Sequence, residues 1–319
     1  MMLIFPSSLK RLGILGMNQR NLDYIGRHNA RHLFPLVDNK IETKRLAGDY
    51  GVPTPTLQHV LHTQHSIRNL GEHLRGLDGF AIKPARGAGG KGIMVIRKVS
   101  DGLFVKSSGQ TIDLDGLKRH CSNILAGLHS LAGATDSAII EDLIDPDPYF
   151  KDLSVEGVPD IRVIIFRGIP VMAMLRLSTH ASDGKANLHQ GAIGVGLDLA
   201  TGYCAHAVQH ARRVLVHPDT GVALNRISIP DWQNLLTLAA SCHDLSGLGY
   251  LGADLVVDRT RGPLLLELNA RPGLSIQVAN GEGLLPRLRR IEAIERVSSD
   301  ATDRAGFAMS HFGRQPLQV

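Results

Sequence analysis

The chain contains no long hydrophobic segment, and this absence excludes whole classes of protein. No run of about 18 apolar residues occurs in its 319 residues, so no segment is expected to span a membrane. The first residues lack the basic, apolar and small-residue order of a secretory signal. The expected localisation is therefore the cytoplasm.

Cysteines and aromatic residues are also scarce. Cys121, Cys204 and Cys242 are far apart and form no C-x-x-C pair, which argues against a disulfide framework and a zinc site. Aromatic residues make up only 4% of the chain, so a nucleic-acid surface is the weaker interpretation of its net charge of +5. A phosphate-bearing small ligand or an acidic polymer explains the charge as well.

The chain is long enough for one large domain or two lobes, since 43% of its residues are hydrophobic. We expect a basic N-terminal arm over residues 1–37, a catalytic domain over 38–297 and a mobile tail over 298–319. The lobes of the domain are expected over about 38–140 and 141–297. Hairpins alternate with helices, which favours α+β lobes with mainly antiparallel sheets over a doubly wound parallel sheet. Helices are expected from residue 39 and over 66–77, 114–131, 231–245 and 283–297.

Two oxygen-bearing side chains end the apolar run at residues 266–269. In a strand, residues i and i+2 lie on the same face, so Glu267 and Asn269 would present their oxygens side by side. Asp254 lies in the preceding apolar run, and a turn over 259–262 predicts a hairpin that brings it close to Glu267. Such hard oxygen ligands suit Mg²⁺, which shares its remaining positions with nucleotide phosphates. A buried strand that ends in polar residues is the alternative.

A glycine-rich loop separates two expected strands at residues 79–84 and 93–96. Glycines let backbone N–H groups approach phosphate oxygens closely, which favours a phosphate lid over an ordinary hairpin loop. The loop lacks the Walker spacing and runs from strand to strand, so neither a P-loop nor a Rossmann fingerprint fits. The loop residues with this role are Gly87, Gly89, Gly90, Lys91 and Gly92.

Lysines near this loop are candidates for contact with phosphate. Lys83 ends an otherwise apolar strand and needs an anionic partner if it faces inward; a side chain that reaches solvent is the alternative. Lys40 would supply a second charge near the phosphates, although a solvated lysine at the start of a helix is the alternative.

Glu141 ends another apolar strand and would accept a hydrogen bond from the amino group of adenine. The stretch that follows would offer backbone groups to the base, over Asp142, Leu143 and Ile144. Either Asp145 or Asp147 would accept from the ribose hydroxyls.

Further polar residues interrupt apolar or flexible segments. Arg162 and Arg176 lie within apolar strands, where an inward arginine needs an acid or a phosphate; a structural salt bridge is the alternative. Asn187 and His189 lie in a polar loop that would gate the site or hold a substrate, and simple exposure is the alternative for His189.

Taken in order, these segments resemble the ATP-grasp superfamily, and the chain is most similar to its alpha-L-glutamate ligase-like, RimK-related branch. The resemblance rests on residues 38–40, 82–84, 87–92, 140–144, 160–163, 187–189, 252–254 and 267–273. It implies an ATP-grasp fold with ATP between the two lobes, Lys40 and Lys83 at the phosphates and the glycine loop as a lid. Asp254, Glu267 and Asn269 would hold two Mg²⁺ ions, with Mn²⁺ as an alternative.

The resemblance also implies a reaction. The expected activity is carboxylate–amine ligation through an acylphosphate, with glutamate joined to an amine, a peptide or a protein acceptor. Arg162, Arg176 and Arg271 are candidates for stabilising the transferred group or gripping the acid. A kinase or a non-catalytic nucleotide-binding module is the alternative. Family members usually carry an N-terminal domain that helps bind the substrate. We therefore expect residues 1–37, a second subunit or a partner protein to complete the acceptor site.

Overall fold

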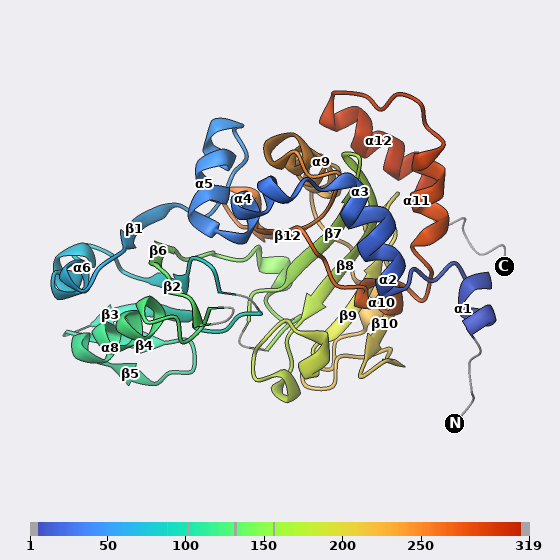
Figure 1. Cartoon of the computed structure of the whole chain (residues 1–319). Coiled ribbons are helices and arrows are strands. Elements are labelled where there is room, and N and C mark those ends of the chain that lie inside the picture. The colour runs from blue at the N-terminus through green and yellow to red at the C-terminus, as the bar shows by residue number, and fades with distance from the viewer. Residues whose placement is uncertain (1–5, 88, 101, 131–132, 156, 314–319) are drawn as a thin grey trace. The chain divides into compact units, whose positions relative to one another are not determined.

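The computed structural model describes residues 6–87, 89–100, 102–130, 133–155 and 157–313, which form two compact units (Figure 1). The larger unit comprises Met1–Asp38, Leu46–Pro53 and Pro146–Val319, and the smaller unit comprises Asn39–Arg45 and Thr54–Asp145. Helix α5 (Lys40–Asp49) contributes residues to both units.

The described residues of the larger unit form a seven-stranded antiparallel sheet in the order β11-β10-β9-β8-β7-β12-β13. Its strands are β7 (Asp160–Phe166), β8 (Ile169–Leu177), β9 (Ile193–Leu197), β10 (Cys204–Gln209), β11 (Arg212–Arg213), β12 (Tyr250–Asp258) and β13 (Gly262–Asn269). The predicted hairpin is confirmed, because β12 pairs with β13 and Asp254 lies opposite Glu267.

Helix α9 (Trp232–Ser246) covers this sheet and confirms the helix expected over 231–245. Leu235, Leu238, Cys242 and Leu245 are buried at helical spacing, and Leu236, Ala239 and Ala240 are buried as well, so more than one stripe of the helix is covered. The helix ends at Gly247, whose left-handed φ of +67° lets its N–H bond back to the carbonyl of His243.

Residues 6–38, which we call the N-terminal segment, are part of the core of the larger unit. The segment contains α1 (Pro6–Arg11), α2 (Met17–Gln19), the π-helix η1 (Arg20–Ile25), α3 (Gly26–His28), the 3₁₀ helix η2 (Arg31–Leu33) and α4 (Phe34–Asp38). The ring of Tyr24 is fully buried, and its centroid lies 5.4 Å from that of Phe166 and 5.8 Å from that of Tyr250. The segment is therefore packed into the fold through an aromatic cluster.

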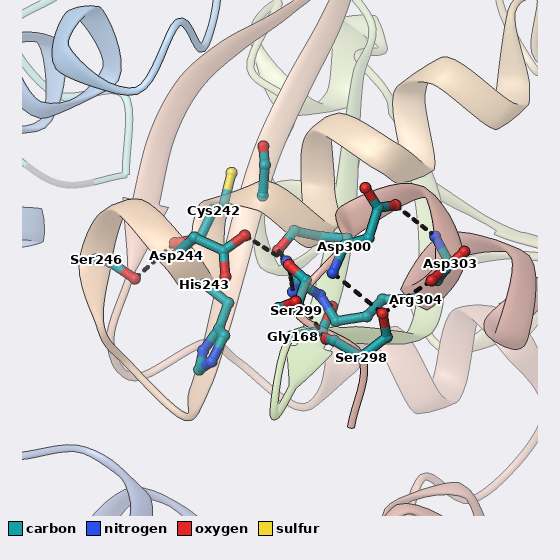
Figure 2. Close-up of polar contacts among 12 residues, drawn as sticks. Gly168, Cys242, His243, Asp244, Ser246, Ser298, Ser299, Asp300, Asp303 and Arg304 are labelled. Atoms are coloured by element: carbon teal, nitrogen blue, oxygen red, sulfur yellow. Dashed lines mark hydrogen bonds and ion pairs between the residues drawn. The ribbon is translucent and has the colours of Figure 1, made fainter. Parts of the chain in front are cut away.

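Residues 298–313 of the expected mobile tail contain a helix, and residues 314–319 lie outside the described residues. After α10 (Ser275–Asn280) and α11 (Leu285–Glu292), which is shorter than the helix expected over 283–297, residues Ala301–Phe312 form α12. Arg304 fixes α12 from a buried position (Figure 2). Its guanidinium donates to the carbonyls of Gly168, Ala240, Ser298 and Ser299 and to the carboxylate of Asp244. Ala305, Ala308 and Phe312 are buried beside Arg304 at helical spacing, and this was the signal available in the sequence.

The described residues of the smaller unit form a six-stranded antiparallel sheet in the order β1-β6-β2-β3-β4-β5. Its strands are β1 (Leu57–Leu61), β2 (Phe80–Pro84), β3 (Met94–Ser100), β4 (Leu103–Lys106), β5 (Thr111–Ile112) and β6 (Ala138–Asp142). Helix α8 (Leu114–Leu125) begins at Asp113, whose carboxylate accepts from the Gly116 N–H at 2.7 Å.

One predicted helix of the smaller unit is interrupted. Two short helices, α6 (Gln64–Arg68) and α7 (Leu70–His73), replace the single helix expected over 66–77, because Asn69 leaves helical geometry at ψ 12°. Both sheets are antiparallel and carry helices, so the predicted α+β class is confirmed. None of the helices in the described ranges is long and apolar enough to cross a membrane.

Candidate functional site

One face of the larger sheet carries a row of five charged side chains. The strand register places Arg176 opposite Asp160, Arg162 opposite Asp254, and Asp254 opposite Glu267. Directly opposed residues of antiparallel strands extend to the same face, and Asp160 and Arg162 are two positions apart on β7. We call these five residues, which come from four neighbouring strands, the charged row.

Asn269 extends the charged row along β13. It lies two residues beyond Glu267 and opposite Gly252, so it shares the face of the row. The register shifts just beside Glu267: Asp254 faces Glu267 but Leu255 faces Leu265. This β-bulge occurs where the predicted ligands gather, and bulges commonly re-aim side chains beside functional sites.

Two arginines hold Asp254, which is only 2% exposed. Arg162 donates from Nε and Nη2 to Oδ1 and Oδ2 of Asp254, at 2.7 and 2.6 Å. Arg176 donates from Nη2 to Oδ2 of Asp254 at 2.7 Å and also pairs with Asp160. Both inward arginines therefore have the acidic partners that their burial requires. Their predicted contact with a transferred group stays a prediction.

The two buried acids of the row have opposite pKa shifts. Burial acts to raise the pKa of Asp254, but Arg162 and Arg176 outweigh it and hold that pKa well below its ordinary value. Burial raises the pKa of Asp160 to about 6 against the effect of Arg176, and the charge of Asp254 adds to this rise. Asp254 is therefore ionised at neutral pH and can interact with a cation.

The oxygen-bearing side chains of the charged row, together with Asn269 beside it, are of the kind that bind Mg²⁺. Nδ2 of Asn269 is buried, and the described residues offer it no hydrogen-bond partner. Rotation of the amide about its terminal bond would present Oδ1 there instead. Asp254 accepts three hydrogen bonds, and a carboxylate has about four lone-pair positions, so one remains for a cation. Within the described ranges, no three His, Cys, Asp or Glu side chains could hold a metal by themselves. A site here therefore depends on the carboxamide of Asn269.

In the smaller unit, Glu141 on β6 accepts from two lysines. Lys83 Nζ donates to Oε1, and Lys44 Nζ lies 3.0 Å from Oε2. The side chains of Lys83, Lys44 and Glu141 are only 13%, 8% and 2% exposed. Lys83 thus faces inward with Glu141 as its anionic partner, while its contact with a phosphate stays a prediction. The two lysines therefore share one buried carboxylate, and the charge of the neighbouring Asp142 also acts on Lys44.

Lys40 and Lys44 occupy different positions on α5. Lys40, predicted to lie at the phosphates, donates from Nζ to the carbonyl of Gly87 at 2.8 Å, at the start of the glycine loop. Sequence reasoning missed Lys44, which comes one helical turn later. The i, i+4 spacing from Lys40 places both lysines on one face of the helix, and this was the available signal.

The glycine loop has backbone geometry that only glycine adopts readily. Gly89, Gly90 and Gly92 have φ values of +65°, +75° and +75°. A Cβ at Gly92 would lie 2.6 Å from the ring of His129, whereas nothing lies within 4 Å of one at Gly89 or Gly90. The space beside the backbone is therefore open at Gly89 and Gly90, as a phosphate lid requires. Lys91, which follows these two glycines, is exposed.

Asp136 holds the N-terminal end of this loop. Its carboxylate accepts from the Arg86 N–H at 3.0 and 3.1 Å and from the Ser130 hydroxyl at 2.7 Å. Together with the contact from Lys40 to Gly87, this fixes the residues that lead into the loop.

The residues predicted around adenine and ribose follow β6. Asp142 Oδ1 accepts from Gln58 Nε2 at 2.5 Å, and Leu143 and Ile144 are half-buried. Asp147 caps the 3₁₀ helix η4 (Pro148–Phe150), with Oδ1 accepting from the Tyr149 N–H at 2.8 Å. Asp145 is exposed. Their contacts with a nucleotide stay predictions.

Other predicted residues have local partners. Asn187 Oδ1 accepts from the His189 N–H at 3.0 Å and caps the 3₁₀ helix η6 (Leu188–Gln190), while the side chain of His189 is exposed. Arg271 donates to Asp38 at 2.9 Å and lies 4.8 Å above the centroid of the Phe34 ring. Arg271 is thus bound to the N-terminal segment.

Two antiparallel sheets, one with a glycine loop and buried lysines and the other with carboxylates in register, define an ATP-grasp fold. The sequence matches the family described as sugar-transfer associated ATP-grasp over residues 19–293, and the chain belongs to this family. The predicted superfamily is therefore confirmed, while the RimK-related branch stays a prediction. No curated protein matches the chain.

The chain is also similar to solved structures at low sequence identity. The ATP-grasp ligase PsnB complexed with minimal precursor is 15% identical, with a TM-score of 0.44, over 88% of this chain and 63% of that chain. D-cycloserine synthetase DcsG is 15% identical, with a TM-score of 0.44, over 81% of this chain and 70% of that chain. D-alanyl-alanine synthetase A from Vibrio cholerae is 10% identical, with a TM-score of 0.46, over 87% of this chain and 65% of that chain. The chain therefore spans less than two thirds of the length of PsnB.

Proposed function

We propose that the chain is an ATP- and Mg²⁺-dependent ligase that joins a carboxylate to an amine through an acylphosphate. The observation that carries this proposal is the charged row, in which two arginines keep Asp254 ionised opposite Glu267. Membership of an ATP-grasp family supports the use of ATP.

Most of the predicted groups have a role in this proposal, and Lys44 joins them. Lys83 and Lys44 neutralise phosphate charge, the glycine loop covers the phosphates, and Glu141 with the backbone of residues 142–144 contacts adenine. Asp254, Glu267 and Asn269 would hold Mg²⁺, which when bound neutralises phosphate charge and orients the triphosphate. Arg162 and Arg176 position Asp254 and add positive charge where the phosphoryl group is transferred.

The reaction has two balanced steps. A carboxylate oxygen attacks the γ-phosphorus of ATP, the bond to the β,γ-bridging oxygen breaks, and ADP leaves. An amine then attacks the acyl carbon, phosphate leaves with the electrons of the C–O bond, and a proton is released as the amide forms. The protein mainly positions the reactants and compensates charge.

The substrates belong to the proposal too. Glutamate is the first carboxylate to test, with free amines and peptides as acceptors. The description of the family links it to sugar transfer, so amino sugars belong in the acceptor panel.

Hydroxylamine trapping tests the proposal directly. Purified chain with ATP, Mg²⁺, one carboxylic acid and hydroxylamine should form a hydroxamate, because hydroxylamine captures an acylphosphate. Mass spectrometry with the amine panel should then identify an amide that forms together with ADP. Glu267→Gln should abolish both products, whereas the exposed control Glu295→Gln should leave them unchanged.

The same experiment separates the alternatives. A stable phosphorylated product that forms without any amine and resists hydroxylamine would identify a kinase instead. Tight ATP binding with no ADP release from any acid would identify a non-catalytic nucleotide-binding module.

A further inference from the structure

Three consecutive residues that follow Asn269 are each held by the N-terminal segment. Asn29 Nδ2 donates to the carbonyl of Ala270 at 3.1 Å. Asp38 accepts from the guanidinium of Arg271 at 2.9 Å. Arg20 Nη1 donates to the carbonyl of Pro272 at 2.8 Å.

Asn29 also binds the strand next to β13. Its Nδ2 donates to the carbonyl of Tyr250 at 2.7 Å, and its Oδ1 accepts from the Tyr250 N–H at 2.9 Å. One buried carboxamide therefore joins the start of β12 to the end of β13. These are the two strands that carry Asp254 and Glu267.

The segment itself has little freedom to move. Its residue Leu15 exchanges two hydrogen bonds with the side chain of Gln277, at 2.8 and 3.1 Å, and the buried ring of Tyr24 packs against Phe166. These anchors, one before Arg20 and one between Arg20 and Asn29, support the segment where it contacts residues 270–272.

The orientation of the Asn269 side chain depends on how firmly the neighbouring backbone is held. Nδ2 of Asn269 is buried and finds no partner among the described residues, so this nitrogen does not help to orient the side chain. Its direction is then set largely by the backbone at residues 269 and 270. Asn29 binds the backbone carbonyl of Ala270, and Arg20 binds that of Pro272. Asp38 acts through the side chain of Arg271.

We propose that Arg20, Asn29 and Asp38 are positioning residues that hold Asn269, and with it β13, in the geometry needed to bind a divalent cation. This inference rests on the proposed function, because it assumes that Asn269 is a cation ligand. It assigns the N-terminal segment a role within the larger unit that differs from completing an acceptor site. Groups that orient metal ligands commonly change metal affinity when they are replaced.

Binding of Mn²⁺ in the presence of ADP, measured by electron paramagnetic resonance without turnover, tests the inference. Arg20→Met and Asp38→Ala should each weaken Mn²⁺ binding about tenfold. Affinity for ADP in the presence of EDTA should stay unchanged. Arg20→Lys, which keeps a donor, should recover part of the loss.

The N-terminal segment also provides matched controls. Arg27 and Asp23 form an exposed ion pair, with 3.4 Å between Nη2 and Oδ1. Arg27→Met and Asp23→Ala should leave Mn²⁺ affinity unchanged. Thermal unfolding of every variant reports on the integrity of the fold.

Three results would overturn the inference. Mn²⁺ affinity could be the same in Arg20→Met and Arg27→Met. Alternatively, Mn²⁺ and metal-free ADP affinities could fall together with the melting temperature, which would indicate a structural role only. If the unaltered chain binds ADP but no Mn²⁺, the proposed metal site fails first and the inference fails with it.

Discussion

Lys44 and Glu141 form a buried ion pair in the smaller unit, with 3.0 Å between Nζ and Oε2. The same carboxylate also accepts from Lys83. Burial lowers the pKa of Lys44, although the charge of Glu141 opposes this shift. The cluster is thus an acid shared by two lysines, and the charge of Asp142 also acts on Lys44.

Replacing Lys83 should weaken nucleotide binding with little loss of stability. Lys83→Met removes one cation, but Lys44 remains to neutralise Glu141. We expect about tenfold weaker ATP binding, the effect of losing one charge-assisted hydrogen bond. Calorimetric titration with ATP and Mg²⁺ measures this. Lys118→Met is the matched control, and equal affinity in the two variants would contradict the prediction.

The stability provided by Glu141 should depend on pH. Burial acts to raise the pKa of Glu141, but Lys83 and Lys44 outweigh it and lower that pKa below 4.5. The ionised carboxylate therefore stabilises the fold above pH 4.5, and this contribution is lost as pH falls through the lowered pKa. Glu141→Gln should cost about 3 kcal/mol at neutral pH, because it leaves buried lysines without their counter-ion.

Urea unfolding at several pH values measures this effect. The difference in free energy of unfolding between the unaltered chain and Glu141→Gln should shrink as pH falls below 4.5. A difference that stays constant across that range would show that the lysines do not depend on the ionised acid.

The two carboxylates opposed on β12 and β13 should respond differently to substitution. Asp254→Asn removes the charge that Arg162 and Arg176 share, so we expect a loss of about 3–5 kcal/mol in the free energy of unfolding. Glu267→Gln should cost less, since Glu267 is only half-buried, but it should abolish the Mg²⁺ dependence of ATP binding. Denaturant unfolding and ATP titration with and without Mg²⁺ distinguish the two effects. Equal stability losses would count against this division of roles.

Arg304 should affect stability and leave the site unchanged. Arg304→Met removes the donor that binds these carbonyl groups and the carboxylate of Asp244 (Figure 2), so we expect a loss of about 3 kcal/mol. Thermal unfolding should show the loss, while affinity for ATP stays the same. The exposed Arg290→Met is the control. A melting temperature equal to that of this control would show that α12 does not depend on Arg304.

The sequence by itself determined the α+β class, the β12–β13 hairpin and the glycine loop. Each depends on local patterns, such as apolar residues at strand spacing and glycines between two strands, and such patterns fix conformation over a few residues. The pairing of Asp254 with Glu267 followed from these patterns because a short turn sets the register of a hairpin.

Only the tertiary structure decided which charged groups from distant segments meet. Asp160 and Asp254 are far apart in sequence but share Arg176, and Lys44 reaches Glu141 from a helix that begins about a hundred residues earlier. The N-terminal segment and α12 are also held by polar side chains that bind distant carbonyl groups. Hydrophobic periodicity does not predict such contacts. A hydrogen bond between remote segments depends on how the strands and helices pack, and it produces no local sequence pattern.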